Sequence, residues 1–155
     1  MRKRVLTVLL LTTAVMVGSE TVAADWPQFL GPNRNGVYLG TDLAESWPEA
    51  GPRVIWQKTL GHGFSGPVVA DHKLILFHRL ADNETVECLD ARTGSNIWSF
   101  AYPTHYQDDF GFDDGPRATP TINEGRVYTF GAEGMLHCLD FENGKELWRL
   151  FPYPQ

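Results

Sequence analysis

Short apolar and polar runs alternate along most of the chain, and the same order of runs occurs twice. Residues 67–77 match residues 120–130 at an offset of 53, and residues 88–98 match residues 138–148 at an offset of 50. Apolar runs of this length, bounded by turn residues, predict strands rather than helices. A fixed period of about 50 residues is typical of a β-propeller or a repeat array.

Each copy carries one turn at the same place. An aspartate ends an apolar run, a glycine follows four residues later, and a tryptophan follows four residues after that. The short carboxylate accepts hydrogen bonds from backbone N–H groups just downstream, and glycine supplies the positive φ that closes the turn. The large ring is predicted to pack between neighbouring sheets. The landmarks of the repeat are Asp90, Gly94, Trp98, Asp140, Gly144, Trp148 and, from a preceding unit, Trp56.

These elements predict an all-β fold, a β-propeller with four-stranded antiparallel blades. Residues 67–101 and 117–151 are each expected to form one blade, with a longer hairpin loop in the first copy. Residues 53–60 are predicted to be the closing strand of a further blade, and residues 25–52 an arm that lies across the sheets. Pairing such a strand with distant ones is how propellers remove an exposed edge.

Residues 1–24 have the pattern of a secretory signal peptide. Three basic residues precede an apolar run that is too short to span a bilayer comfortably, and small residues follow it. Cleavage would leave no membrane span and would change the formal net charge from −6 to −8, because three basic residues and one acidic residue are removed. The chain is therefore expected to be exported to the periplasm or the extracellular space. An acidic chain also argues against nucleic acid as a partner.

The repeat resembles that of the PQQ-like β-propeller proteins. The resemblance rests on Leu-Asp-x-x-x-Gly-x-x-x-Trp in both copies and on the Pro-x-Val strand before the first, and it covers residues 25–155. The opening DWPQFLGPNRNG is similar to secreted bacterial members, which are often described as resembling the propeller of the outer-membrane barrel-assembly machinery. Family members have seven or eight blades, which needs roughly 350–400 residues. The resemblance therefore implies an N-terminal fragment or a truncated product, unstable or self-associating on its own.

The loop between the two copies, residues 105–117, is the most unusual stretch. Four carboxylates could hold calcium, namely Asp108, Asp109, Asp113 and Asp114, but their spacing is not that of an EF-hand. The favoured interpretation is a solvated acidic loop, pinned by Phe110 and Phe112, in which Arg117 pairs with one of the acids. The residues predicted to form a binding loop are His62, Ser65, His105, Tyr106 and Arg117.

The two cysteines are predicted to be free thiols. Cys88 and Cys138 are equivalent positions of successive blades, so one would have to reach through its own sheet to meet the other. Sheets pack about 10 Å apart, whereas a disulfide needs Cα atoms within about 7 Å.

Three classes of function remain open. The first is a non-catalytic extracytoplasmic scaffold that binds a protein or peptide. The second, implied only by the resemblance, is a quinone-dependent dehydrogenase, whose PQQ and calcium would come with the family rather than from any constellation seen here. The third is a carbohydrate- or polymer-binding propeller, for which Tyr102, Tyr106 and Tyr153 are candidate contacts. No catalytic residues are identified, so the sequence favours a protein that is not an enzyme.

Overall fold

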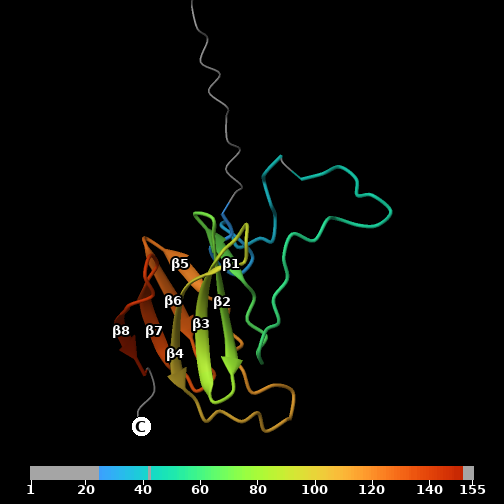
Figure 1. Cartoon of the computed structure of the whole chain (residues 1–155). Coiled ribbons are helices and arrows are strands. Elements are labelled where there is room, and N and C mark those ends of the chain that lie inside the picture. The colour runs from blue at the N-terminus through green and yellow to red at the C-terminus, as the bar shows by residue number, and fades with distance from the viewer. Residues whose placement is uncertain (1–24, 42, 152–155) are drawn as a thin grey trace, which may run out of the picture.

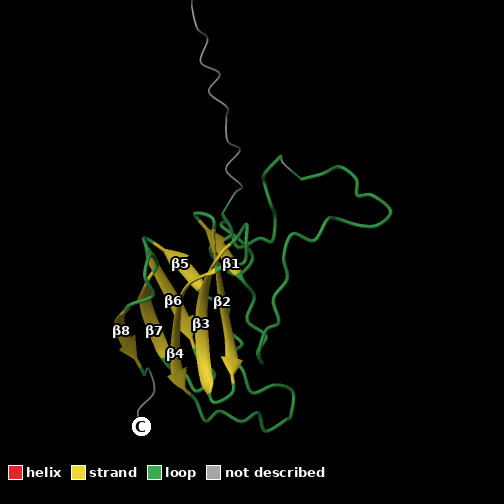
Figure 2. Ribbon diagram, viewed as in Figure 1, coloured by secondary structure: helices red, strands yellow, loops and turns green. Residues whose placement is uncertain are grey.

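The computed structural model describes residues 25–41 and 43–151, which form two antiparallel sheets. Within this part of the chain there is no helix, and the strands are β1 (Val68–Ala70), β2 (Lys73–Leu80), β3 (Asn83–Asp90), β4 (Asn96–Pro103), β5 (Thr121–Asn123), β6 (Arg126–Phe130), β7 (Leu136–Asp140) and β8 (Glu146–Leu150). Strands β1 to β4 form one sheet in sequence order and β5 to β8 form the other (Figures 1 and 2). The predicted four-stranded antiparallel blades are confirmed.

The aspartate turns close β3 to β4 and β7 to β8 in the same way. Asp90 Oδ1 accepts hydrogen bonds from the backbone N–H groups of Arg92 at 2.9 Å and Thr93 at 2.8 Å. Its backbone carbonyl accepts from Gly94, which has a φ of 72°. Asp140 and Gly144 repeat these contacts, and Gly144 has the same φ. A residue with a Cβ atom adopts this φ only at a cost, so glycine is required at both turns.

The hairpin of the first sheet differs from its prediction. The three extra residues lengthen the strands rather than the loop: β2 and β3 have eight residues each, whereas β6 and β7 have five. The pairs His78↔Thr85, Arg79↔Glu84 and Leu80↔Asn83 extend the ladder to a two-residue turn. Pairing is favoured because each added rung satisfies backbone groups that a loop would leave to water.

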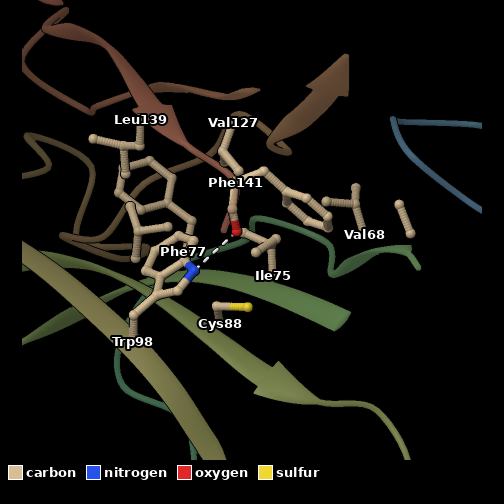
Figure 3. Close-up of a cluster of buried hydrophobic side chains, with 10 residues drawn as sticks. Val68, Ile75, Phe77, Cys88, Trp98, Val127, Leu139 and Phe141 are labelled. Atoms are coloured by element: carbon tan, nitrogen blue, oxygen red, sulfur yellow. Dashed lines mark hydrogen bonds between the residues drawn. The ribbon is translucent and has the colours of Figure 1, made fainter. Parts of the chain in front are cut away.

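The two sheets pack face to face around Trp98, as predicted. Trp98 lies on β4 and its ring reaches the 140–144 turn of the second sheet, where Nε1 donates a 3.0 Å hydrogen bond to the carbonyl of Phe141 (Figure 3). The ring lies so close to Gly144 that an added Cβ there would be 2.5 Å from it. Val127 and Leu139 of the second sheet complete a core with Ile75, Phe77, Val86 and Cys88 of the first.

Residues 53–60 repeat this contact without forming the predicted strand. Trp56 Nε1 donates to the carbonyl of Ala91 at 3.0 Å, and its ring lies 2.8 Å from where a Cβ on Gly94 would be. Trp56 therefore contacts the first turn as Trp98 contacts the second. The segment has no strand assignment because a strand requires a hydrogen-bonded neighbour, and none of the described residues pairs with it.

The arm predicted for residues 25–52 crosses the sheets only in its first part. Trp26 exchanges backbone hydrogen bonds with Val69 of β1 at 2.8 and 3.0 Å, and the carbonyl of Pro27 accepts from Ile122 of β5 at 2.8 Å. The arm thus ties together the first strands of both sheets. From about residue 37 the chain turns outward and runs away from them (Figure 1), with Leu39 and Trp47 exposed.

Both cysteines are free and buried, as predicted. Burial raises the pKa of the Cys88 thiol to about 11, and burial also raises that of Cys138. Neither thiol is therefore a ready nucleophile at neutral pH.

The predicted signal peptide, residues 1–24, and Tyr153 lie outside the described residues. Within 25–41 and 43–151, no helical segment of the length and apolarity required to cross a bilayer was found.

Candidate functional site

The loop that joins the sheets, residues 104–120, is held in shape by its own carboxylates. Asp108 accepts from the backbone N–H of Phe112 at 2.6 Å through Oδ2 and from Arg117 Nη2 at 2.7 Å through Oδ1. The N–H of Asp108 in turn donates to Asp114 Oδ1 at 2.7 Å. The bond from Phe112 and then the Arg117 charge lower the pKa of Asp108, so its carboxylate stays ionised well into the acidic range.

Two further contacts fasten this loop to the first sheet. Arg79 of β2 donates from Nη1 to the carbonyls of Tyr106 at 2.6 Å and Asp114 at 3.2 Å. The linker before β1 lies alongside, because the N–H groups of Phe64 and Ser65 both donate to the carbonyl of Pro116, at 2.9 and 3.2 Å. The backbone of the loop is therefore held in one arrangement by hydrogen bonds to the first sheet and to the linker, and Figure 1 shows the loop below the two sheets.

The phenylalanines do not pin the loop, contrary to the expectation. Phe110 and Phe112 are 83% and 74% exposed, and their ring centroids lie 6.4 Å apart. Phe64, on the adjacent linker, is 60% exposed. Hydrogen bonds from Asp108 and Arg79 already fix the backbone, so the rings are free to face solvent. We call Phe64, Phe110 and Phe112 the aromatic edge.

The five predicted binding residues are partly brought together. His62 Nδ1 lies 3.3 Å from Asp113 Oδ2, and both residues line a groove of about 200 Å³. Arg117 lies over the rings of Phe64 and Tyr106, at 5.8 and 5.9 Å from their centroids. The remaining two residues, Ser65 and His105, do not join this group. Ser65 Oγ is buried and has no hydrogen-bond partner in the described part of the chain, and His105 is exposed.

The acidic loop does not fit a calcium ion or the calcium of a quinoprotein. Asp108 is occupied by Arg117 and Phe112, Asp114 by the N–H of Asp108, and Asp113 by His62 and the N–H of Gly115. In residues 25–41 and 43–151, no three side chains of His, Cys, Asp or Glu converge as metal ligands would. A hard cation prefers six to eight oxygen ligands, so we derive no chemical step through calcium or PQQ.

A buried polar chain connects residues 53–62 to the first sheet. Lys58 Nζ lies 3.1 Å from Glu87 Oε2, which is 3.1 Å from His78 Nε2. The N–H of Gly61 donates to His78 Nδ1 at 2.9 Å. His78 must therefore carry its proton on Nε2 and donate to Glu87. In the repeat, Lys58 corresponds to Phe100, because each lies two residues after a tryptophan, and Glu87 corresponds to His137. The Phe100 and His137 rings make the equivalent contact between the two sheets, with centroids 5.2 Å apart.

The two buried histidines, His78 and His137, predict that the stability of the protein depends on pH. Burial lowers the pKa of His78 and of His137 in the folded state, although nearby carboxylates oppose the shift. Below about pH 6.5 the unfolded chain binds protons that the folded chain does not, so the free energy of unfolding falls as the pH falls. We expect urea denaturation to show lower stability at pH 5.5 than at pH 8.

A His78→Gln variant isolates the contribution of His78. It removes one of the two buried histidines whose pKa is lowered. The slope of the unfolding free energy against pH between pH 8 and 5.5 should therefore become smaller. A slope that is unchanged in this variant, or stability that rises toward pH 5.5, would contradict the assignment.

Several contacts were not foreseen from the sequence. The sequence predicts that Phe110 and Phe112 pin the loop, whereas both are exposed, and it gives no sign that Glu84 joins the sheets. Glu84 is 1% exposed and accepts from Tyr102 Oη at 2.5 Å and from the N–H of Ala132 at 2.7 Å. The available signal was two phenylalanines in an otherwise polar loop, which is unusual for a surface that has only to stay soluble.

The sequence model of the family described as outer membrane protein assembly factor BamB matches residues 42–100 and 82–152. Quinohemoprotein alcohol dehydrogenase from Comamonas testosteroni is 30% identical, with a TM-score of 0.43, over 60% of this chain and 13% of that one. BamB from Moraxella catarrhalis is 19% identical, with a TM-score of 0.39, over 60% of this chain and 23% of that one.

A europium-containing methanol dehydrogenase is 19% identical, with a TM-score of 0.48, over 64% of this chain and 18% of that one. The chain thus spans less than a quarter of the length of each of these three solved structures. No curated protein sequence matches it.

Proposed function

Since this chain belongs to the PQQ-like propeller family described as outer membrane protein assembly factor BamB, we propose that it serves as a non-catalytic scaffold that binds protein outside the cytoplasm. The observation that carries the proposal is the aromatic edge. Three exposed phenylalanines lie on a loop and linker whose backbones are fixed by half-buried and exposed hydrogen bonds.

An ordered apolar surface of this kind favours association. Exposed aromatic rings dominate binding energy in protein interfaces, and a loop that is already ordered loses little conformational entropy when it binds. A solvated loop would place polar side chains at Phe110 and Phe112 instead. The chemistry supports a binding surface rather than an active site.

The charge around the edge supports a partner with cationic side chains. Asp109 is exposed, and the only arginine of the loop is already paired with Asp108. Asp113 and Asp114 lie in the same groove as Phe112. We therefore propose a protein surface that combines apolar and basic groups, because opposite charges at the rim speed association and suppress wrong partners.

Export to the periplasm or the extracellular space is part of the proposal. The basic start and short apolar run of residues 1–24 support it, as does a family described by an outer-membrane role.

Photo-crosslinking in the producing cell tests this function. With p-benzoylphenylalanine in place of Phe110, we expect crosslinks to one discrete protein, and fractionation of the same cells should find the chain outside the cytoplasm. The matched control is the same substitution at Ile97 of β4, which is 45% exposed but away from the loop. Equal labelling at both positions, or none at Phe110, would refute the proposal.

A Phe110→Ser, Phe112→Ser double variant is the second test of this function. Because both rings are exposed, unfolding free energy should change by no more than about 0.5 kcal/mol per site, while a crosslink placed at Phe64 should be lost. Retention of that crosslink would show that the two rings do not form the binding surface.

A further inference from the structure

A larger pocket, of about 690 Å³, opens between the two sheets at the ends of β4, β7 and β8. The side chains that matter for its chemistry are Tyr102, Tyr106, Glu133, His137, Arg149 and Phe151. Both blades contribute to it. Its volume lies within the range of about 300–1,000 Å³ that is usual for small-molecule sites.

The aromatic wall of the pocket is held rigidly. The hydroxyl of Tyr102 donates to buried Glu84 at 2.5 Å, and its ring lies 4.1 Å from that of His137, centroid to centroid. Tyr106 is fixed through its backbone, whose carbonyl accepts from Arg79 and whose N–H donates to Thr104 Oγ1 at 3.3 Å. A ring that is already fixed loses little entropy when a ligand packs on it.

The charged side chains that line the pocket are one carboxylate, Glu133, and one guanidinium, Arg149. Glu133 is exposed and accepts from Thr104 Oγ1 at 3.1 Å. Arg149 has a 64% exposed side chain, and Glu146 is 3.9 Å away. The two charges balance, so the pocket presents hydrogen-bonding groups without a net attraction for anions or cations.

His137, which lines the pocket, carries a buried acceptor. Its side chain is 1% exposed, and Glu146 Oε2 lies 3.5 Å from Nε2, which favours a proton on that nitrogen. Nδ1 then has a lone pair, and it is the one buried side-chain nitrogen of residues 25–41 and 43–151 that lacks a hydrogen-bond partner. Leaving a buried acceptor without a partner is unfavourable.

We propose that this pocket binds a sugar residue of a glycan. A pyranose ring offers C–H faces to aromatic rings and hydroxyl groups to charged and neutral acceptors and donors, and it carries no net charge. An apolar peptide side chain would instead cover Glu133 and Arg149 without offering either of them a hydrogen bond, which is costly. This site is distinct from the aromatic edge and does not depend on the proposed protein partner.

Calorimetric titration of the full chain with cellobiose, maltose and N,N′-diacetylchitobiose tests this proposal. We expect at least one of the three to bind, with saturation-transfer NMR showing contact between its ring protons and the protein. Replacing Arg149 by glutamine should weaken that binding about tenfold, the effect of losing one charged hydrogen bond. Because Arg149 is exposed, the variant should fold normally.

The matched control is Arg92→Gln, which changes the same residue type at an exposed position of the 90–94 turn. It should leave sugar affinity unchanged. The proposal is overturned if none of the three sugars binds at millimolar concentration, or if R149Q and R92Q weaken binding equally.

Discussion

Replacing Trp98 by alanine should lower the free energy of unfolding by about 3–5 kcal/mol, the range for truncating a large buried aromatic side chain. Trp98 is 7% exposed and joins the two sheets, because its ring covers Gly144 and its Nε1 donates to Phe141. The variant loses packing and leaves a turn carbonyl without its donor. Urea denaturation followed by circular dichroism measures the change.

Trp148→Ala is the control for Trp98, since it removes the same ring from the equivalent position of the second sheet. Trp148 is 43% exposed, and its ring neighbour is Tyr128, with centroids 6.0 Å apart. We expect a loss of about 1 kcal/mol or less, as is usual for a partly exposed site. Equal losses from the two variants would show that the inter-sheet contact is not what stabilises Trp98.

The second large effect is expected at Glu84. Replacing Glu84 by alanine removes the acceptor of two half-buried donors, Tyr102 Oη and the N–H of Ala132. A donor left without a partner costs about 1–3 kcal/mol when it is fully buried and less when water can reach it, so we expect a loss of about 2–4 kcal/mol in unfolding free energy. The tyrosine remains a donor throughout the neutral range, because burial followed by the nearby Glu84 charge raises the pKa of Tyr102.

Tyr102→Phe separates the two hydrogen bonds of Glu84. It removes one donor but keeps the ring that packs on His137, so its loss should be clearly smaller than that of Glu84→Ala. Both variants are compared by chemical denaturation at pH 7. If Glu84→Ala is no less stable than Tyr102→Phe, the bond from Ala132 does not contribute as we infer.

The candidate site was only partly predictable. Residues 105–117 were recognised as unusual because they interrupt the repeat, and a pair between Arg117 and an acid was expected; the partner is Asp108, at 2.7 Å. The roles predicted for the two phenylalanines and for two of the acids, Asp108 and Asp114, are the reverse of those in the structure. The acids, read as solvated, fix the backbone, whereas Phe110 and Phe112, read as anchors, face solvent. A sequence does not reveal which groups of a loop turn inward when several could fix it.

What the sequence determined by itself is local. The two aspartate–glycine turns, the strands on either side of them and the free cysteines follow from residues a few positions apart and from a repeated spacing, and the structure has them as predicted. Hydrogen bonds within a turn form between neighbours in the chain, so their chemistry can be read in order.

Tertiary structure decided the rest. Trp98 and Trp148 occupy the same place in the repeat, yet one is buried against a turn and the other is exposed. Glu84 joins two hairpins whose residues are 48 positions apart, and the pocket beside His137 exists only where both sheets meet. These properties depend on which segments come together in space. Burial and hydrogen-bond partners are set by packing between distant elements, which the local pattern of a single repeat does not encode.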